Sequence, residues 1–335
     1  MNTCRICLNA NRNKTHLVRE MQFGTRDEFE YFECADCGCL QICEIPEDLS
    51  KYYPKNYYSY SPPNCAIQYD KKGIRGLKER FVRDQITKLY LNRNSRVGAW
   101  LEKRSSLSAN YSSAMDWMKL KRLSLGLRLN SNILDVGCGS GHLLNEMAAH
   151  GFSKLTGVDT FIEQNLRYDN GVKILRKDLE QLHGPFDFIM LHHSFEHLPE
   201  PLSILRKIYT LLNSKCYVLI RIPVTRSYAW MKYGVNWASL DAPRHIYLHT
   251  VESMDLLAHQ TGFRVVDVVF DANGFGLIAS EQYLKNISLM DPRSFFVDPS
   301  KSIFSESELI AFREMDRQLN KNGEADCAGF YLYKD

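Results

Sequence analysis

The segment 132–144, with the sequence NILDVGCGSGHLL, constrains the fold more than any other stretch of this 335-residue chain. A short apolar strand leads into glycines at positions 137, 139 and 141, and the residues up to Gly151 are typical of a helix. Glycines permit a tight turn and let a ligand approach the backbone. The third glycine comes one residue early for the dinucleotide fingerprint, and the Gly-Lys-Ser/Thr of a phosphate-binding loop is missing. We therefore predict a strand–turn–helix unit that binds a ligand of another class.

This segment resembles motif I of the class I S-adenosylmethionine-dependent methyltransferases, and the segments after it keep that family's order. The resemblance runs from about Tyr111 to the end of the chain. It implies an α/β fold, a Rossmann-like seven-stranded sheet whose last strand is antiparallel. The strands are expected at 133–136, 154–159, 172–180, 185–193, 216–224, 264–271 and 327–334, with helices at 142–151, 201–212, 250–263 and 305–323.

The resemblance also implies where the cofactor, S-adenosylmethionine, is bound. Asp159 ends the second strand, where an acid could accept hydrogen bonds from both ribose hydroxyls. Asp178 stands where the family places an acid near the adenine amino group. For both acids the alternative is a carboxylate that only hydrogen-bonds its own loop. The complete set of implied cofactor residues is Asp135, Gly137, Gly139, Gly141, Asp159, Asp178, Leu179 and His192.

The segment 192–201, HHSFEHLPEP, matches the string H-x-x-E-H of inverted zinc peptidases at His193, Glu196 and His197. That motif needs a long helix to present both imidazoles to one ion. Here an apolar strand comes immediately before and Pro199 follows two residues later, which argues against a peptidase. In open α/β folds the carboxyl end of a central strand borders the ligand crevice, so we expect the residues after Leu191 to face the methyl donor.

The letters EHLPEP resemble the EH-x-x-x-P pattern of a subset that includes the ubiquinone O-methyltransferases, some of which hold a divalent metal there. Where that pattern has an acid three residues before the Glu-His pair, this chain has His193. A hard cation prefers oxygen ligands, so the departure argues against bound Mg²⁺.

Methyl transfer to a hydroxyl releases a proton, and an imidazole that titrates near neutral pH is suited to accept it. His193 is the first candidate base and His245 the second. Glu196 and His197 are further candidate catalytic residues, with the alternative that they fix the turn by hydrogen bonds. Transfer could also proceed chiefly by positioning the acceptor in line with the sulfonium, and then no single residue would be indispensable.

Between the fifth strand and the next helix, residues 225–250 are rich in Trp, Tyr, Arg and His. We expect them to form a substrate lid over the cofactor, with Trp237, Arg244 and His245 contacting a sugar or another polyhydroxylated acceptor. The letters DAPRH, from Asp241, resemble a string in zinc-ribbon-bearing methyltransferases of bacterial surface-polysaccharide and secondary-metabolite pathways. The alternative is an aromatic cap on the sheet edge in which Arg244 pairs with Asp241.

The N-terminal region carries two C-x-x-C pairs, Cys4 with Cys7 and Cys34 with Cys37, separated by 26 residues. This spacing predicts a zinc ribbon over residues 1–45, in which four thiolates bind one structural Zn²⁺. With all four positions taken by sulfur, no position is left for a water molecule or a substrate. Cys39 and Cys43 lie near the second pair. Either could replace a ligand, but we interpret both as free thiols in the strands of the ribbon.

Residues 46–110 are predicted to be a connector with a basic helical arm. The segment from Asp70 to Arg104 has eleven Lys or Arg against four acids, with apolar residues in rough helical spacing. A solvated basic helix explains this pattern, and a surface that attracts phosphate is the alternative. Residues 111–335 form the methyltransferase domain that the resemblance implies.

The net charge of +3 lacks the basic excess of a dedicated nucleic-acid binder. No apolar run is long enough to span a bilayer, and the polar start lacks the core of a signal peptide, so we expect a cytoplasmic protein. We predict methylation of a small molecule, a hydroxyl of a nucleotide-linked sugar or surface-glycan precursor. The alternatives are an RNA methyltransferase that holds RNA with the ribbon and basic arm, and a non-catalytic zinc-ribbon adaptor.

Overall fold

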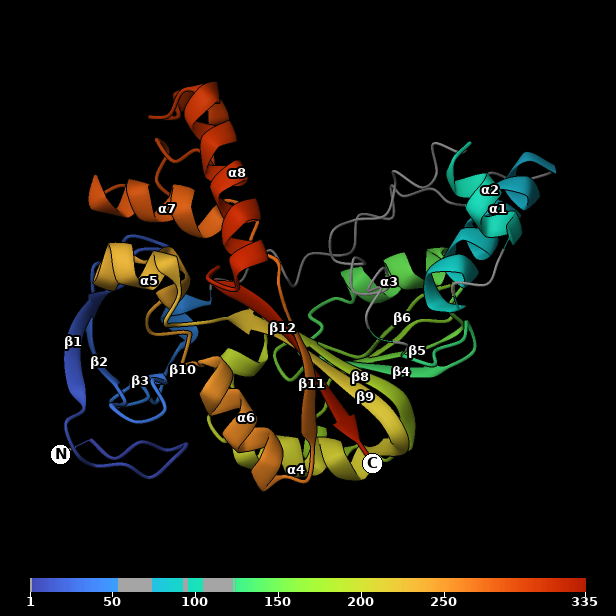
Figure 1. The fold of residues 1–335 in the computed structure, drawn as a ribbon, viewed down its shortest axis with the longest axis horizontal. Coiled ribbons are helices and arrows are strands. Elements are labelled where there is room, and N and C mark those ends of the chain that lie inside the picture. Colours follow the sequence, from blue (N-terminus) through green and yellow to red (C-terminus); the bar gives the residue numbers. More distant parts are fainter. Residues whose placement is uncertain (1, 54–73, 93–95, 105–122, 124) are drawn as a thin grey trace. The chain divides into compact units, whose positions relative to one another are not determined.

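The computed structural model describes residues 2–53, 74–92, 96–104, 123 and 125–335 (Figure 1). The predicted connector therefore lies partly outside the described residues. The chain divides into two compact units, each built from several segments. The first comprises Met1–Lys55, His193–Arg206 and Ile220–Leu332, and the second comprises Asn56–His192, Lys207–Leu219 and Tyr333–Asp335.

The second unit contains most of the strands that the glycine-turn resemblance predicts. Its strands lie in the order β9-β8-β4-β5-β7-β6. Their bounds are β4 Asn132–Val136, β5 Lys154–Val158, β6 Leu166–Arg167, β7 Lys173–Leu175, β8 Phe186–His192 and β9 Leu212–Pro223. Strand β4 pairs in parallel with β5 and β8, and β5 pairs in parallel with β7. Parallel neighbours need crossover connections, and α3 (His142–Ala149) provides the one between β4 and β5.

The first unit contains β11 and most of β12, the remaining strands of this sheet, which lie in the order β11-β12-β9. Both β9 and β12 have residues in both units. The bounds of the two remaining strands are β11 Arg264–Phe270 and β12 Cys327–Lys334. The α-helices that follow β8 in the chain are α4 Pro201–Leu211, α5 Tyr228–Tyr233, α6 Val251–Gln260, α7 Phe275–Leu284 and α8 Glu306–Asn322. The predicted methyltransferase-type α/β fold is confirmed, with the two-residue β6 as one strand more than the seven expected.

The N-terminal residues form a separate antiparallel sheet in the first unit. Its strands are β1 (Lys14–Arg19), β2 (Glu28–Glu33), β3 (Leu40–Ile42) and β10 (Tyr247–Leu248), in that spatial order. The last strand comes from the segment predicted to be a lid, and Tyr247 pairs with Gln41 on β3. The Thr250 hydroxyl also donates a hydrogen bond of 2.6 Å to the Cys37 carbonyl. The ribbon and residues 247–250 thus belong to one hydrogen-bonded structure, which the sequence did not predict.

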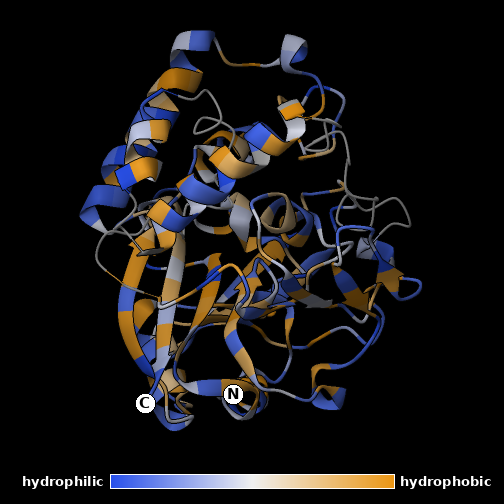
Figure 2. Cartoon of the chain, turned by 90° about the vertical axis from the view of Figure 1, so that its right-hand side faces the viewer, coloured by the Kyte–Doolittle hydropathy of each residue, from blue (hydrophilic) through white to orange (hydrophobic). Residues whose placement is uncertain are grey.

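The described part of the basic arm contains α1 (Ile74–Asn92) and α2 (Arg96–Glu102). Its apolar residues do not all share one buried face. Ile86 is buried, whereas Leu77 and Phe81 are 66% and 56% exposed. Figure 2 shows hydrophobic residues along the sheet strands and mixed hydrophobic and hydrophilic residues on the helices. None of the helices in the described part of the chain is long and apolar enough to cross a membrane.

We predict that Gly157→Ala on β5 destabilises the second unit. An added Cβ would lie 2.4 Å from the Cys138 Sγ and under 3 Å from side-chain atoms of Ile174 and Leu144. Overpacking of this kind costs about 1–3 kcal/mol. Urea unfolding should show this loss, whereas the exposed Lys154→Ala on the same strand should change the free energy of unfolding by less than about 0.5 kcal/mol. A Gly157→Ala variant as stable as the parent would contradict the packing described here.

Candidate active site

The turn after β4 holds its three glycines in the left-handed region of backbone conformation. The φ angles of Gly137, Gly139 and Gly141 are +73°, +54° and +83°. The Gly137 N–H donates to the Val158 carbonyl at 2.8 Å, so the turn is fastened to the end of β5. A Cβ on Gly141 would lie 2.5 Å from the Ile174 Cδ1. Both the conformation and the lack of space require glycine, as the motif predicts.

Asp159, directly after β5, joins this turn to its own loop. Its Oδ2 accepts the Gly139 N–H at 2.9 Å, and its Oδ1 accepts the Phe161 N–H at 2.8 Å. Each carboxylate oxygen can accept more than one hydrogen bond, so the side chain retains capacity for ligand hydroxyls. The loop contact and the predicted ribose contact are therefore compatible.

The other predicted cofactor residues lie at the ends of neighbouring strands of the second unit. Asp135, near the end of β4, is buried, and burial together with Asp159 raises its pKa well above the usual range. Asp178 is exposed and caps the short helix η5 (Leu179–Gln181), where it accepts the Glu180 N–H at 3.0 Å. Leu179 is buried, and His192 is half-buried at the end of β8. For Asp178 the structure thus shows a hydrogen bond within its own loop, which the sequence analysis gave as the alternative to a contact with adenine.

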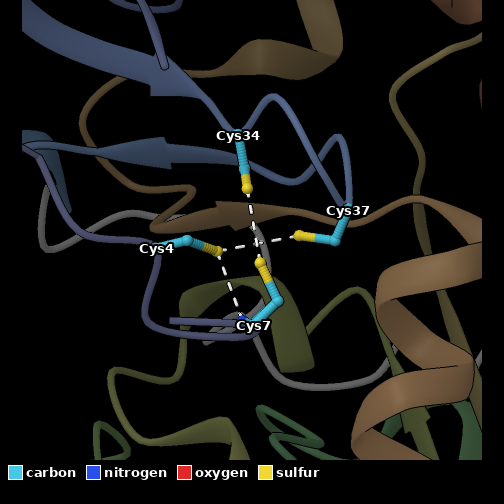
Figure 3. Close-up of side chains that lie close together, drawn as sticks. All are labelled: Cys4, Cys7, Cys34 and Cys37. Atoms are coloured by element: carbon cyan, nitrogen blue, oxygen red, sulfur yellow. Dashed lines mark hydrogen bonds between the residues drawn. The ribbon is translucent and has the colours of Figure 1, made fainter. Parts of the chain in front are cut away.

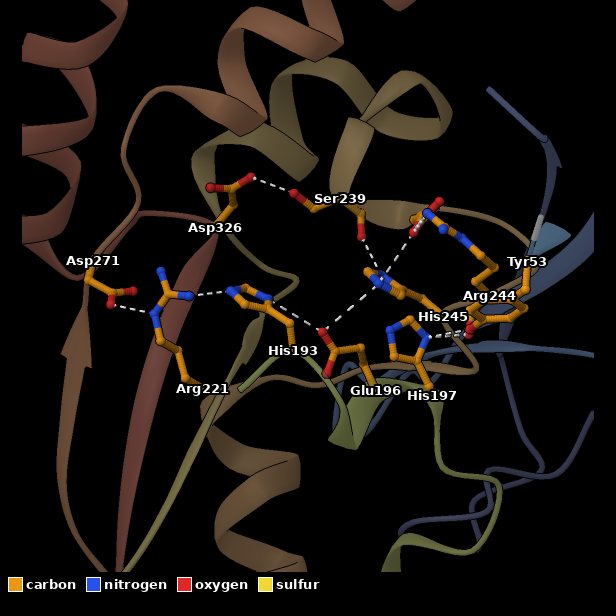
Figure 4. Close-up of polar contacts among 11 residues, drawn as sticks. Tyr53, His193, Glu196, His197, Arg221, Ser239, Arg244, His245, Asp271 and Asp326 are labelled. Atoms are coloured by element: carbon orange, nitrogen blue, oxygen red, sulfur yellow. Dashed lines mark hydrogen bonds and ion pairs between the residues drawn. The ribbon is translucent and has the colours of Figure 1, made fainter. Parts of the chain in front are cut away.

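A group of polar side chains in the first unit begins at His193, the residue after β8 (Figure 4). His193 has a φ of +51°, and its backbone N–H donates to the Arg221 carbonyl at 2.9 Å. Residues other than glycine rarely adopt this conformation, and such residues concentrate at functional sites. The His193 side chain is 47% exposed, so the ring is accessible to a substrate.

Glu196 is completely buried on the short helix η6 (Phe195–His197). Its Oε1 lies 3.5 Å from the His193 Nδ1 and 3.9 Å from the His245 Nε2. Burial alone would raise the pKa of Glu196, but His193, His197 and His245 outweigh it and lower that pKa to about 2. The structure therefore places a buried carboxylate among three imidazoles.

Two of these imidazoles are oriented by backbone carbonyl groups. His197 contacts the Arg244 carbonyl through Nδ1 at 2.8 Å, and the Tyr53 hydroxyl lies 3.3 Å from the same nitrogen. His245 contacts the Ser239 carbonyl through Nδ1, also at 2.8 Å. Burial lowers the pKa of His245 to about 4, so this ring is neutral near pH 7. All four predicted catalytic residues thus lie in one group.

Arg221 and Asp271 belong to this group but were missed by the sequence analysis. The Arg221 Nε donates to an Asp271 oxygen at 2.6 Å, and its guanidinium contacts the His193 Nε2 (Figure 4). Burial works against the charge of Arg221, but neighbouring anions raise its pKa above the usual value. A signal existed in the sequence, because Arg221 is a charged residue within the otherwise apolar run VLIRIP.

The predicted substrate residues Trp237 and Arg244 are both buried. The Trp237 Nε1 donates to an Asp326 oxygen at 2.7 Å, and the Ser239 hydroxyl lies 3.3 Å from the same oxygen. Arg244 pairs with Asp241, and the sequence analysis gave this pair as the alternative to a substrate contact. Arg244 also contacts the Gln22 side chain. These contacts form within the first unit and hold the segment that carries His245.

The four predicted metal ligands Cys4, Cys7, Cys34 and Cys37 converge in the N-terminal sheet (Figure 3). The sulfurs of Cys4 and Cys37 lie 3.6 Å apart, and those of Cys7 and Cys34 lie 3.4 Å apart. Sulfurs bound tetrahedrally to zinc are separated by about 3.8 Å, which fits this cluster. The Cys37 thiol lowers the pKa of Cys4 to about 4, and the Gln41 amide donates to the Cys4 sulfur at 2.8 Å. The four thiols could therefore hold one tetrahedral ion.

We predict that Co²⁺ added to the metal-free chain gives a thiolate-to-cobalt charge-transfer band. Cys34→Ser should abolish or strongly reduce the band, because one of the four sulfur ligands is lost. Cys43→Ser should keep it, since the Cys43 side chain lies outside the cluster of four. Equal bands in the two variants, measured by near-ultraviolet absorption, would contradict the assignment of the ligands.

Comparison with known families gives one match, over residues 111–268, to a family described as a methyltransferase domain. This match confirms the domain that the glycine turn and the strand order predicted. It covers the turn after β4, Asp159 and the polar group from His193 to His245.

Relatives with curated descriptions include two ubiquinone biosynthesis O-methyltransferases. The one from Aeromonas salmonicida is 29% identical over 150 residues, which are 40% of this chain and 60% of that protein. The one from Psychrobacter arcticus is 27% identical over 192 residues, 51% of this chain and 71% of that protein.

The solved structures to which this chain is similar include a SAM-dependent methyltransferase from Archaeoglobus fulgidus, 20% identical with a TM-score of 0.38. That match covers 61% of this chain and 86% of the other. A cyclopropane synthase from Mycobacterium tuberculosis is 16% identical with a TM-score of 0.40, covering 75% of this chain and 94% of that one.

Proposed function

We propose that this protein transfers a methyl group from S-adenosylmethionine to a hydroxyl of a small molecule. The proposal starts from the methyltransferase domain at residues 111–268. The observation that carries the proposal is the left-handed glycine turn fastened to Asp159, whose carboxylate retains hydrogen-bonding capacity. Two relatives are named as O-methyltransferases, which supports oxygen as the methylated atom.

In the proposed reaction, S-adenosylmethionine supplies an electrophilic methyl group on its sulfonium. The backbone at Gly137 and Gly139 would let the cofactor approach closely, and Asp159 would accept hydrogen bonds from its ribose hydroxyls. The site would hold the acceptor oxygen toward this methyl carbon, which would leave the sulfur as it is transferred, and an imidazole would take the hydroxyl proton. Holding the acceptor in line with the sulfonium would also contribute to the rate.

His193 is the better of the two candidate bases. Its side chain is 47% exposed, whereas that of His245 is 10% exposed and its Nδ1 is engaged by the Ser239 carbonyl. A guanidinium only donates hydrogen bonds, so the contact with Arg221 requires an unprotonated Nε2 on His193. An acceptor hydroxyl that takes the place of Arg221 at His193 would transfer its proton to Nε2. The Glu196 carboxylate near Nδ1 would then stabilise the imidazolium that forms.

The acceptor class follows from the polar groups around His193. The guanidinium of Arg221 contacts the His193 ring, and the Asp271 carboxylate pairs with that guanidinium (Figure 4). Such a set suits a molecule with several hydroxyls better than an apolar ring. We therefore assign a nucleotide-linked sugar or surface-glycan precursor, which the resemblance of DAPRH also supports. The four N-terminal thiolates are assigned a structural Zn²⁺, whose role is to fix the sheet of β1, β2, β3 and β10.

We expect Asp159→Asn to weaken S-adenosylmethionine binding at least tenfold. The substitution keeps the shape but removes the charge, and hydrogen bonds to a charged group contribute about 1.5–3 kcal/mol. Calorimetric titration gives the dissociation constant. Asp178→Asn, at an exposed helix cap, should weaken binding less. Unchanged affinity in Asp159→Asn would reject the ribose contact.

We expect His193→Asn to lower kcat by about 10²–10⁴-fold, the usual contribution of a general base, and to leave cofactor affinity nearly unchanged. Asn tolerates the left-handed backbone at this position, so the loss is not due to misfolding. His183→Asn, at an exposed position, serves as the matched control. Turnover is followed as S-adenosylhomocysteine release with a glycan-precursor fraction as the acceptor. Full turnover in His193→Asn would reject the base.

A further inference from the structure

We propose that the hairpin of β6 and β7, residues 166–175, orders the glycine turn for cofactor binding, with Tyr168 as its main positioning residue. The two strands pair in antiparallel fashion, with Leu166 opposite Ile174. The inference rests on the proposed function, because it takes the turn after β4 to be the S-adenosylmethionine site. It adds to that function a second group of residues that act on the turn besides Asp159.

The connection from β5 to β7 is unusual for two parallel neighbours. Such strands need a crossover connection of a dozen or more residues, which is usually an α-helix. Residues 159–172, all of which the structure describes, contain β6 and turns but no α-helix. The hairpin therefore occupies the place in the chain that a crossover helix usually takes.

The tip of the hairpin has an ordered backbone. The Tyr168 N–H donates to the Val172 carbonyl at 3.0 Å, and the Gly171 N–H donates to the Tyr168 carbonyl at 2.9 Å. Gly171 has a φ of +91°, in the region that favours glycine. These hydrogen bonds fix the backbone from which the Tyr168 side chain extends.

Two side chains of the hairpin contact the glycine turn and the helix after it. The Tyr168 hydroxyl donates to the Ser140 carbonyl at 2.7 Å, and Tyr168 is half-buried while Ser140 is buried. The Asn170 Nδ2 donates to the Asn145 Oδ1 on α3 at 2.8 Å. The Asn145 Nδ2 in turn donates to the Gly141 carbonyl at 2.9 Å. The hairpin is thus bonded to the turn directly and through α3.

These contacts complement the hydrogen bond from Gly139 to Asp159. Asp159 holds the turn at Gly139, and the hairpin holds the next two residues, Ser140 and Gly141. Glycine loses more conformational freedom on ordering than any other residue, so a turn with three glycines is costly to order. A turn that is ordered before the cofactor arrives does not consume binding free energy. Tyr168 therefore raises the affinity for S-adenosylmethionine through the turn.

The competing explanation is that these contacts only stabilise the edge of the sheet. Tyr168 would then contribute to the free energy of unfolding, but its loss would change neither the local order of the glycine turn nor the affinity for the cofactor. Both of these quantities are measurable, and they separate the two explanations.

The first test is hydrogen exchange in the full chain without cofactor, read by mass spectrometry over the peptide 132–145. Tyr168→Phe removes only the hydroxyl, and we expect exchange in this peptide to become about three- to tenfold faster. Asp169→Ala, at the exposed neighbouring position of the same hairpin, should leave the exchange unchanged. Equal exchange in Tyr168→Phe and the parent would overturn the proposal.

The second test is calorimetric titration with S-adenosylmethionine. Tyr168→Phe should weaken binding about three- to tenfold, and kcat at saturating cofactor should stay the same because the bound cofactor then orders the turn. Asn170→Ala, at an exposed position, should act in the same direction with a smaller effect. Tyr217→Phe removes the same hydroxyl from a half-buried tyrosine on β9 and should keep the parent's affinity.

Unchanged affinity in Tyr168→Phe would also overturn the proposal, even if exchange became faster. A parent chain that binds no S-adenosylmethionine would instead reject the proposed function. In that case the exchange measurement, which uses no cofactor, still decides whether the hairpin orders the turn.

Discussion

The hydrogen bond from the Gly139 N–H to Asp159 is the interaction on which the cofactor side of this protein depends. It joins the turn after β4 to the loop after β5, two strands that pair in parallel. The turn requires three residues at positive φ, which only glycine adopts without strain. The carboxylate thereby orders the glycine turn, and under the proposed function it would also accept hydrogen bonds from the ribose of the cofactor.

In the first unit the corresponding constraint is the buried charge of Glu196. A carboxylate without water must be compensated, and the histidines at 193, 197 and 245 lie around it. Backbone carbonyls fix two of these rings, and the contacts with Arg244, Asp241 and Ser239 hold the segment that supplies His245. The polar group is therefore ordered before any acceptor arrives.

The strands, the main helices and the cysteine cluster were predictable because each depends on local signals, namely apolar runs, glycine turns and ligand spacing. The strand β10 was not, because the two residues Tyr247 and Leu248 carry no periodic pattern and pair with distant β3. The candidate bases were singled out by their positions, because His193 follows the fourth strand and His245 lies in the segment after the fifth strand. The contacts from His193 to Arg221 and from Arg221 to Asp271 were not predicted, because they join three separate strands or strand ends, and no local sequence pattern encodes such contacts.

The central claim is that the protein methylates a hydroxylated small molecule. The most direct test is to incubate it with methyl-labelled S-adenosylmethionine and an extract of its own host, and to count label in the small-molecule, glycan, RNA and protein fractions. The account predicts label in the sugar or glycan fraction, abolished by Asp159→Ala. Label in RNA alone, or no label in any fraction with acceptors present, would contradict it.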